Sequence, residues 1–239
     1  MNAKVVGQHS LFVANGTLET LKWVGVVLMT ADHINKYLLN YAIPLLFNVG
    51  RLTVPIFAFV LACNLARPGF LNHGGAGRVI IRLAVFGLLA TPAVMALGGL
   101  MHGWWPLNIL FMLLVATATI WCLHRGGIVA WLGGCLIFGV AGSVVEFWWP
   151  AIALCVGFWL YVKRPGVAPM LLVVASTGAL GIINGTSWAL AALPLLVAAV
   201  KLPSVVPRVT WMFYAYYPIH LSCICLIRWQ LTRDGHFFP

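Results

Sequence analysis

The sequence predicts an all-α integral membrane protein with about nine transmembrane helices. Hydrophobic residues make up 62% of the 239 residues, and charged residues make up 8%. The mean hydropathy is +1.00. Soluble domains are about 25% charged, so 14 basic and 4 acidic side chains are too few to build a water-soluble surface on a chain of this length.

Nine apolar segments, separated by Gly, Pro and Asn breakers, are candidates for membrane-spanning helices. A spanning helix needs about 20 apolar residues. The sixth to eighth segments are short, so one or two are expected to be tilted, partly re-entrant or merged, and about eight to ten spans fit the pattern. No internal repeat or soluble domain interrupts them, and residues 1–239 are therefore predicted to form a single integral membrane domain. The nine segments are residues 18–39, 44–66, 79–101, 106–123, 127–145, 147–162, 168–183, 186–200 and 209–230.

The distribution of basic residues predicts the orientation. Cytoplasmic loops of membrane proteins are enriched in Lys and Arg. Alternate connections place most basic residues on one side, so with nine spans the N-terminus is predicted to be cytoplasmic. The basic side holds Lys4, Lys22, Arg67, Arg78, Arg82, Arg125, Lys163, Arg164, Lys201 and Arg208, whereas the other holds Lys36, Arg51, Glu146, Arg228 and Arg233.

Neither the charge nor the cysteines predict a nucleic-acid or metal site. The formal net charge is +10, but the basic residues stand at the ends of apolar runs and form no patch. This is the arrangement that membrane insertion selects, so the predicted partner is membrane lipid and no nucleic acid. The six cysteines lie in apolar segments and form no C-x-x-C pair, which is typical of small packing residues.

Four ionisable residues lie where the chain is predicted to be inside the bilayer: Asp32, His33, Arg51 and His220. Each costs about 2.5–3.5 kcal/mol to insert, so each is a functional candidate. His33 is suited to act as a general base because its ordinary pKa is near neutral. Asp32 needs a partner, and the sequence leaves His33, Arg51 and His220 as alternatives. The competing interpretation is that these histidines only bond one helix to another.

Lys22 and His33 are eleven residues apart and share one helix face, separated by about 16 Å along the axis. A ligand with an anionic head and a long thin arm would fit this line, with its head at Lys22 and its reactive end at His33. Arg78 and Arg82 are spaced i, i+4. They are most simply cytoplasmic markers, but the spacing would also allow them to hold one phosphate together.

At these residues the sequence resembles the TraX family of conjugal-transfer proteins, including its TrbP members. The order and spacing of the matching elements cover nearly the whole chain, and Asp-His, Arg-Leu-x-x-Pro and Tyr-Pro-x-His are specific in combination. The matching stretches are Leu21-Lys22-Trp23, Met29-Thr30-Ala31-Asp32-His33-Ile34, residues 50–59, Pro106-Leu107-Asn108-Ile109-Leu110 and residues 213–221.

The resemblance implies a multi-span protein of the bacterial inner membrane that acetylates the N-terminal amine of the conjugative pilin subunit. Acetyl-CoA would be the acyl donor, and no metal is implied. The wider set of transmembrane acyltransferases carries Lys/Arg-x10-His on one helix, so His33 with Asp32 would be catalytic and Lys22 would hold the CoA end. That set often has a cytoplasmic Arg-x-x-Arg, from which the spacing of Arg78 and Arg82 departs. The other residues expected to line the site are Arg51, Asn108 and His220.

Three alternatives remain open at this point. The acceptor could be a sugar hydroxyl instead of an amine. The protein could be a non-enzymatic transporter or pilus-assembly protein, although a scaffold has no need for Asp32, His33 and Arg51 inside the membrane. A haem held by His33 and His220 is the least favoured reading, because intramembrane histidines are more often hydrogen-bonding residues.

Overall fold

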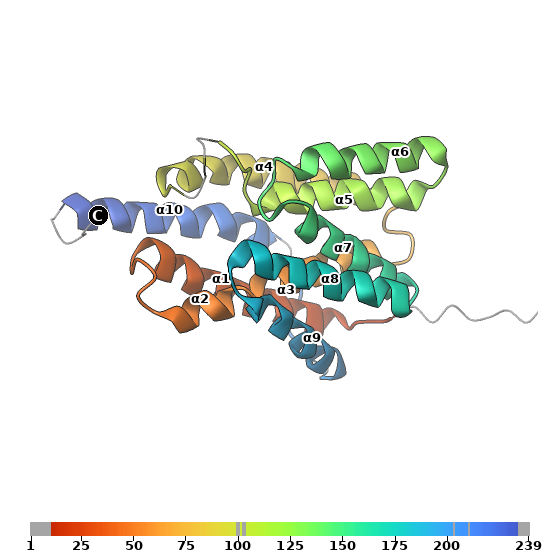
Figure 1. Ribbon diagram of the computed structural model, residues 1–239, viewed down its shortest axis with the longest axis horizontal. Helices are drawn as coiled ribbons and strands as arrows, with labels where there is room; N and C mark the ends of the chain where they lie inside the picture. Colours follow the sequence, from red (N-terminus) through yellow and green to blue (C-terminus); the bar gives the residue numbers. More distant parts are fainter. Residues whose placement is uncertain (1–10, 99–100, 102–103, 203, 210, 234–239) are drawn as a thin grey trace, which may run out of the picture.

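The computed structural model describes residues 11–98, 101, 104–202, 204–209 and 211–233, and this part of the chain is helical (Figure 1). An isolated β-bridge joins Leu107 and Val145. A π-helical turn, Ile137–Ala141, follows α6, and a 3-10 turn, Ser187–Ala191, precedes α9. The helices are α1 (Asn15–Tyr37), α2 (Pro44–Gly50), α3 (Thr53–Leu65), α4 (Gly75–Ala96), α5 (Ile109–Arg125), α6 (Ile128–Leu136), α7 (Trp148–Lys163), α8 (Val167–Asn184), α9 (Ala192–Lys201) and α10 (Trp211–Arg233).

Each of the nine predicted apolar segments corresponds to helix in the described residues. The second segment is α2 and α3 in succession, and the fifth is α6 with its π turn. Three helical stretches, Pro44–Leu65, Gly75–Ala96 and Val167–Asn184, are long and apolar enough to cross a membrane. Lys4 and the end of the third predicted segment, residues 99–100, lie outside the described residues.

The helices pack around a core centred on α3, α5 and α7. Ile56, Ala58 and Ala62 on α3 are fully buried, as are Ile152 and Leu154 on α7. In Figure 1, α10 lies along α4 and α1, and α8 lies along α7. The outer faces of several helices are apolar instead of polar, which is typical of a surface that meets lipid.

The break between α2 and α3 lies beside α1 and shapes the site. Pro55 has no N–H to donate back to Arg51, so the helix cannot continue smoothly through this point. Gly50 ends α2 against α1: a Cβ at this position would lie 2.5 Å from the Cβ of Asp32. The missing side chain of Gly50 therefore lets α2 approach α1 closely enough to contact Asp32.

We expect Gly50→Ala to destabilise the protein, because the added methyl would overlap the Asp32 side chain. Overpacking of this kind costs about 1–3 kcal/mol. The thermal-unfolding midpoint of the purified protein measures the effect. Gly77→Ala on α4 is the matched control, since nothing lies within 4 Å of its added Cβ. Equal midpoints for the two variants would show that the close approach of α2 to Asp32 is not needed.

Candidate functional site

Two cavities lie along α1 and share a common wall. The cavity at the His33 end, called here the His33 cavity, has a volume of about 110 Å³. The cavity at the Lys22 end, called the arginine cavity because Arg78, Arg82 and Arg208 line it, has a volume of about 200 Å³. The residues that line both cavities are Met29, Thr53, Val54, Ile109 and Tyr217.

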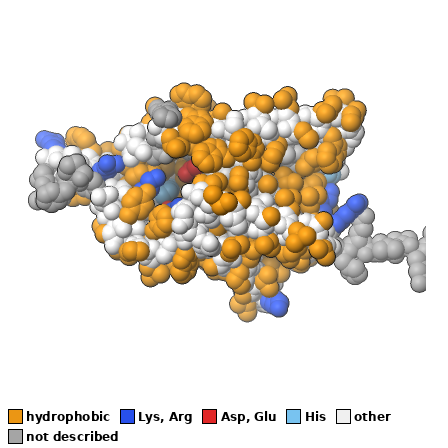
Figure 2. Space-filling model, viewed as in Figure 1, with side chains coloured by type: hydrophobic (Ala, Val, Ile, Leu, Met, Phe, Trp, Pro, Cys, Tyr) orange, Lys and Arg blue, Asp and Glu red, His pale blue; other side chains and the backbone are white. Residues whose placement is uncertain are grey.

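Ionisable side chains line the His33 cavity. Figure 2 shows acidic, basic and His side chains gathered in a hollow, with hydrophobic atoms around it. The ionisable side chains that line this cavity include Asp32, His33, Lys36, Arg51 and Glu146. As the spacing on α1 predicts, Lys22 and His33 lie along the same line of cavities, with Met29 between them.

His33 is held by a second histidine. His33 Nδ1 lies 2.8 Å from His220 Nε2, and the two rings are parallel. His220 Nδ1 lies 2.9 Å from the Tyr216 carbonyl, which can only accept a hydrogen bond, so His220 Nδ1 donates to it. His220 Nε2 must then accept from His33 Nδ1–H, which leaves the lone pair on His33 Nε2. His33 Nε2 has no hydrogen-bond partner among the described residues, and the ring lines the cavity.

His220 itself lies behind His33, outside the set of residues that line either cavity. It is 6% exposed. The sequence prediction that His220 lines the site is corrected in this respect: it positions His33. The hydrogen bond between the two rings also leaves no space for an iron atom coordinated from both sides, so the haem interpretation loses its geometric basis.

Asp32 pairs with Arg51, one of the three alternatives that the sequence left open. Arg51 also donates from Nε to the Phe47 carbonyl at 3.1 Å and from Nη1 to Asn184 Oδ1 at 3.4 Å. Asp32 is 8% exposed, and its Oδ1 has no hydrogen-bond partner among the described residues. The pair therefore places a guanidinium and an incompletely satisfied carboxylate at the wall of the His33 cavity.

Asn108 is not brought to either cavity, contrary to the expectation that it lines the site. Both of its amide hydrogens are donated within the core, to the Gly87 carbonyl at 3.0 Å and to Thr91 Oγ1 at 3.2 Å. Its Oδ1 accepts from the Leu110 N–H at 3.1 Å and caps the start of α5. Asn108 therefore holds α5 to α4, and its side-chain N–H groups are both already bonded.

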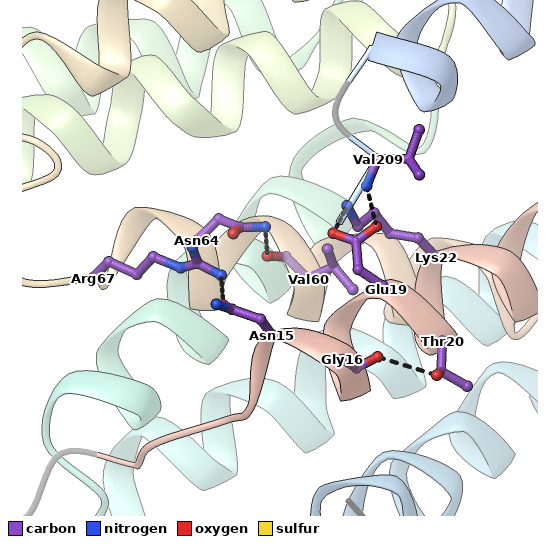
Figure 3. A network of polar contacts seen from close by, with 9 residues as sticks. All are labelled: Asn15, Gly16, Glu19, Thr20, Lys22, Val60, Asn64, Arg67 and Val209. Carbon is purple, nitrogen blue, oxygen red and sulfur yellow. Dashed lines mark hydrogen bonds and ion pairs between the residues drawn. The ribbon is translucent and has the colours of Figure 1, made fainter. Parts of the chain in front are cut away.

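Lys22 is neutralised by a neighbour that the sequence analysis did not consider. Lys22 Nζ lies 2.5 Å from Glu19 Oε1, and Figure 3 shows the two side chains turned toward each other. Glu19 Oε2 also accepts from the Val209 N–H at 3.3 Å, so the pair ties the segment before α10 to α1. The i, i+3 spacing of Glu19 and Lys22 on one helix is the feature of the sequence that could have predicted this ion pair.

Three arginines therefore supply the unpaired positive charge in the arginine cavity. Arg78 and Arg82 line this cavity from α4, and Arg208 lines it from the segment before α10. Among the described residues none of the three forms an ion pair. Arg208 was predicted only as a marker of the cytoplasmic side, because its nearness to the other two arises from the tertiary fold.

Glu146 also received no site role in the sequence analysis. It follows the π turn after α6 and lines the His33 cavity. The sequence places it at a boundary between two apolar segments, where an acidic residue is unremarkable. The backbone pairing between residues 144–146 and Leu107 brings it to the cavity and to the start of α5.

The comparison with known proteins agrees with the resemblance. The chain is 28% identical over 232 residues to Protein TraX of Escherichia coli, in an alignment that covers 90% of this chain and 87% of that protein. No solved structure gives a significant match. The family model described as TraX protein matches residues 17–228, a range that contains His33 and both cavities' charged residues. The chain therefore belongs to the TraX protein family.

Proposed function

We propose that the chain is a membrane-embedded acetyltransferase that moves an acetyl group from acetyl-CoA to the N-terminal amine of a conjugative pilin subunit. We further propose that it is a polytopic protein of the bacterial inner membrane, with about nine spans and its N-terminus in the cytoplasm. The observation that carries the proposal is the open His33 Nε2 in a cavity that backs directly onto a basic one.

The arginine cavity suits the donor. Its guanidinium groups, on Arg78, Arg82 and Arg208, are the kind that bind phosphate through paired N–H donors. Apolar residues, including Val26 and Met29, line the way from Lys22 to the wall shared with the His33 cavity. The proposed fit places the CoA phosphates at the arginines, the thin pantetheine arm along α1, and the thioester at the shared wall.

The chemistry at the shared wall needs one base and one positive group. The acceptor nitrogen attacks the thioester carbonyl, and His33 Nε2 takes a proton from that nitrogen. The C–S bond then breaks, and the thiolate takes the proton from His33. Arg51 stabilises the oxyanion of the tetrahedral intermediate, a role for which Asn108 has no spare donor.

We expect His33→Ala to lower the rate of acetyl transfer by about 100- to 10,000-fold, the usual contribution of a general base. The assay follows acetylation of a pilin peptide by mass spectrometry, with purified protein and acetyl-CoA. His124→Ala is the control, because His124 lines neither cavity and bonds Asn72 instead. A fully active His33→Ala variant would remove His33 from the mechanism. Normal pilus assembly without any acetyl transfer would favour the scaffold alternative.

We expect Arg208→Ala to raise the KM for acetyl-CoA by about 10- to 100-fold, because a charge-assisted contact with a phosphate is lost. The value of kcat should change little, since Arg208 is remote from the acetyl group. Arg125→Ala is the matched control: Arg125 lies over the Trp121 ring and outside both cavities. If the KM for acetyl-CoA is the same in Arg208→Ala and in wild type, the donor does not use this arginine.

A further inference from the structure

Glu146 is an acidic side chain without an ion pair beside the proposed base. The described residues contain two ion pairs, Glu19 with Lys22 and Asp32 with Arg51. Glu146 belongs to neither, yet it lines the His33 cavity together with His33. Its carboxyl group is bonded by the Ile109 N–H but forms no ion pair among the described residues, so it can still bind a cationic ligand in the cavity.

The backbone around Glu146 is held firmly in place. The Glu146 N–H donates to the Leu107 carbonyl at 2.8 Å, and the Leu107 N–H donates to the Val144 carbonyl at 2.7 Å. On the other side, Phe147 and Trp148 adopt positive φ angles of 60° and 49°, a conformation that aromatic residues rarely take. The chain thus turns sharply at Glu146, and the carboxyl group stays at the cavity.

Burial and nearby positive charge shift the pKa of Glu146 in opposite directions. Burial raises the pKa of Glu146, while Lys36, Arg51 and the Ile109 N–H at the start of α5 act in the opposite direction, and Asp32 adds to the rise. A carboxylate with a raised pKa is a better proton acceptor near neutral pH than an ordinary one. The other titratable groups that line the cavity are His33, Tyr37, Tyr41 and Tyr217.

A second observation in the same cavity points to a cationic ligand. Asp32 is 8% exposed, and its Oδ1 has no hydrogen-bond partner among the described residues. Lys36 is the other cation at the cavity, and its Nζ lies 4.9 Å from the centre of the Tyr37 ring instead of forming an ion pair with Glu146. The two cations and two carboxylates that line the cavity balance in charge, and Asp32 Oδ1 is an acceptor that the ammonium group of a ligand can bond.

An amine acceptor that arrives as the ammonium ion has to lose more protons than a hydroxyl acceptor. An N-terminal amine has a pKa of about 7.7–8.0, so near pH 7 it arrives mainly as the ammonium ion. The ammonium must lose one proton before it can attack and a second one afterwards, whereas a hydroxyl loses one in all. His33 alone serves a hydroxyl, but an amine that binds as the ammonium ion needs a second proton acceptor.

We propose that Glu146 binds the ammonium form of the acceptor and takes its first proton, and that His33 takes the second. This inference rests on the proposed function and specifies the acceptor class for that site. It makes Glu146 the residue that selects an amine, and it leaves His33 as the base during bond formation.

The proposed steps balance as follows. The Glu146 carboxylate accepts one proton, and the neutral amine attacks the acetyl carbonyl, so that a C–N bond forms and the carbonyl electron pair moves to oxygen. His33 Nε2 accepts the second proton from nitrogen. The oxyanion collapses, the C–S bond breaks, and the thiolate takes the proton from His33. Glu146 returns its proton to water, giving an N-acetylated acceptor, CoA thiol and one released proton.

The first test compares Glu146→Gln with wild type in acetylation of a peptide that carries the N-terminus of the mature pilin. We expect the KM for the peptide to rise by about 10- to 100-fold, because a charge-assisted contact is lost. The deficit in kcat/KM should grow as the pH falls from about 8 to 6, since the variant can use only the shrinking fraction of free amine. The KM for acetyl-CoA should not change.

Two further variants control for damage to the loop. Glu146→Asp keeps the carboxylate and should restore part of the activity. Ser143→Ala alters the same loop at a side chain that only donates to the Val140 carbonyl and lines neither cavity, so it should match wild type. A Glu146→Gln variant with unchanged KM and an unchanged pH dependence would overturn the inference.

A binding measurement separates this inference from the proposed reaction. By calorimetry at pH 6, without acetyl-CoA, wild type should bind the free-amine peptide at least about tenfold more tightly than the same peptide already N-acetylated. Glu146→Gln should bind the two peptides equally. Equal binding by wild type refutes the role of Glu146 even where acetyl transfer occurs. A clear preference without any acetyl transfer supports that role and refutes the proposed reaction.

Discussion

The ion pair between Asp32 and Arg51 is the contact on which the rest of the site depends. It joins the C-terminal half of α1 to the break between α2 and α3, and Gly50 provides the space for it. Removing one member of a buried pair costs about 3–5 kcal/mol, because the other charge is left without a partner. Since His33 follows Asp32 directly, the same pair fixes the direction in which the imidazole faces the cavity.

Two groups of charged residues at the cavities differ in their partners. Asp32 with Arg51, and Lys22 with Glu19, form ion pairs within the fold and help to determine how the helices are placed. The arginines of the arginine cavity and Glu146 have no ion-pair partner among the described residues. Buried or half-buried charge is costly unless it is compensated. The second group is therefore where ligands of opposite charge are expected, with anions at one end of α1 and a cation at the other.

Much of this arrangement could be predicted from the sequence because it depends on local patterns. Apolar runs predicted every helical segment, and an eleven-residue spacing predicted that Lys22 and His33 share a face. Asn108 was misassigned: an Asn just before an apolar run is a common helix cap, and it serves as one here. Glu146 and Arg208 were missed for the opposite reason. Each reaches its cavity through contacts between segments far apart in the chain, and no local pattern records such contacts.

The hydrogen bonds of the two histidines determine which ring nitrogen can accept a proton. His220 Nδ1 is bonded to the Tyr216 carbonyl of its own helix, so its Nε2 can only accept. His33 can take a proton at Nε2 while keeping its bond to His220, whereas protonation of His220 Nε2 would break that bond. In the proposed reaction, a proton taken from the acceptor would therefore stay on the side of His33 that faces the cavity, where the thiolate would depart. In the proposed reaction, His220 would thus act through the tautomer and orientation of His33.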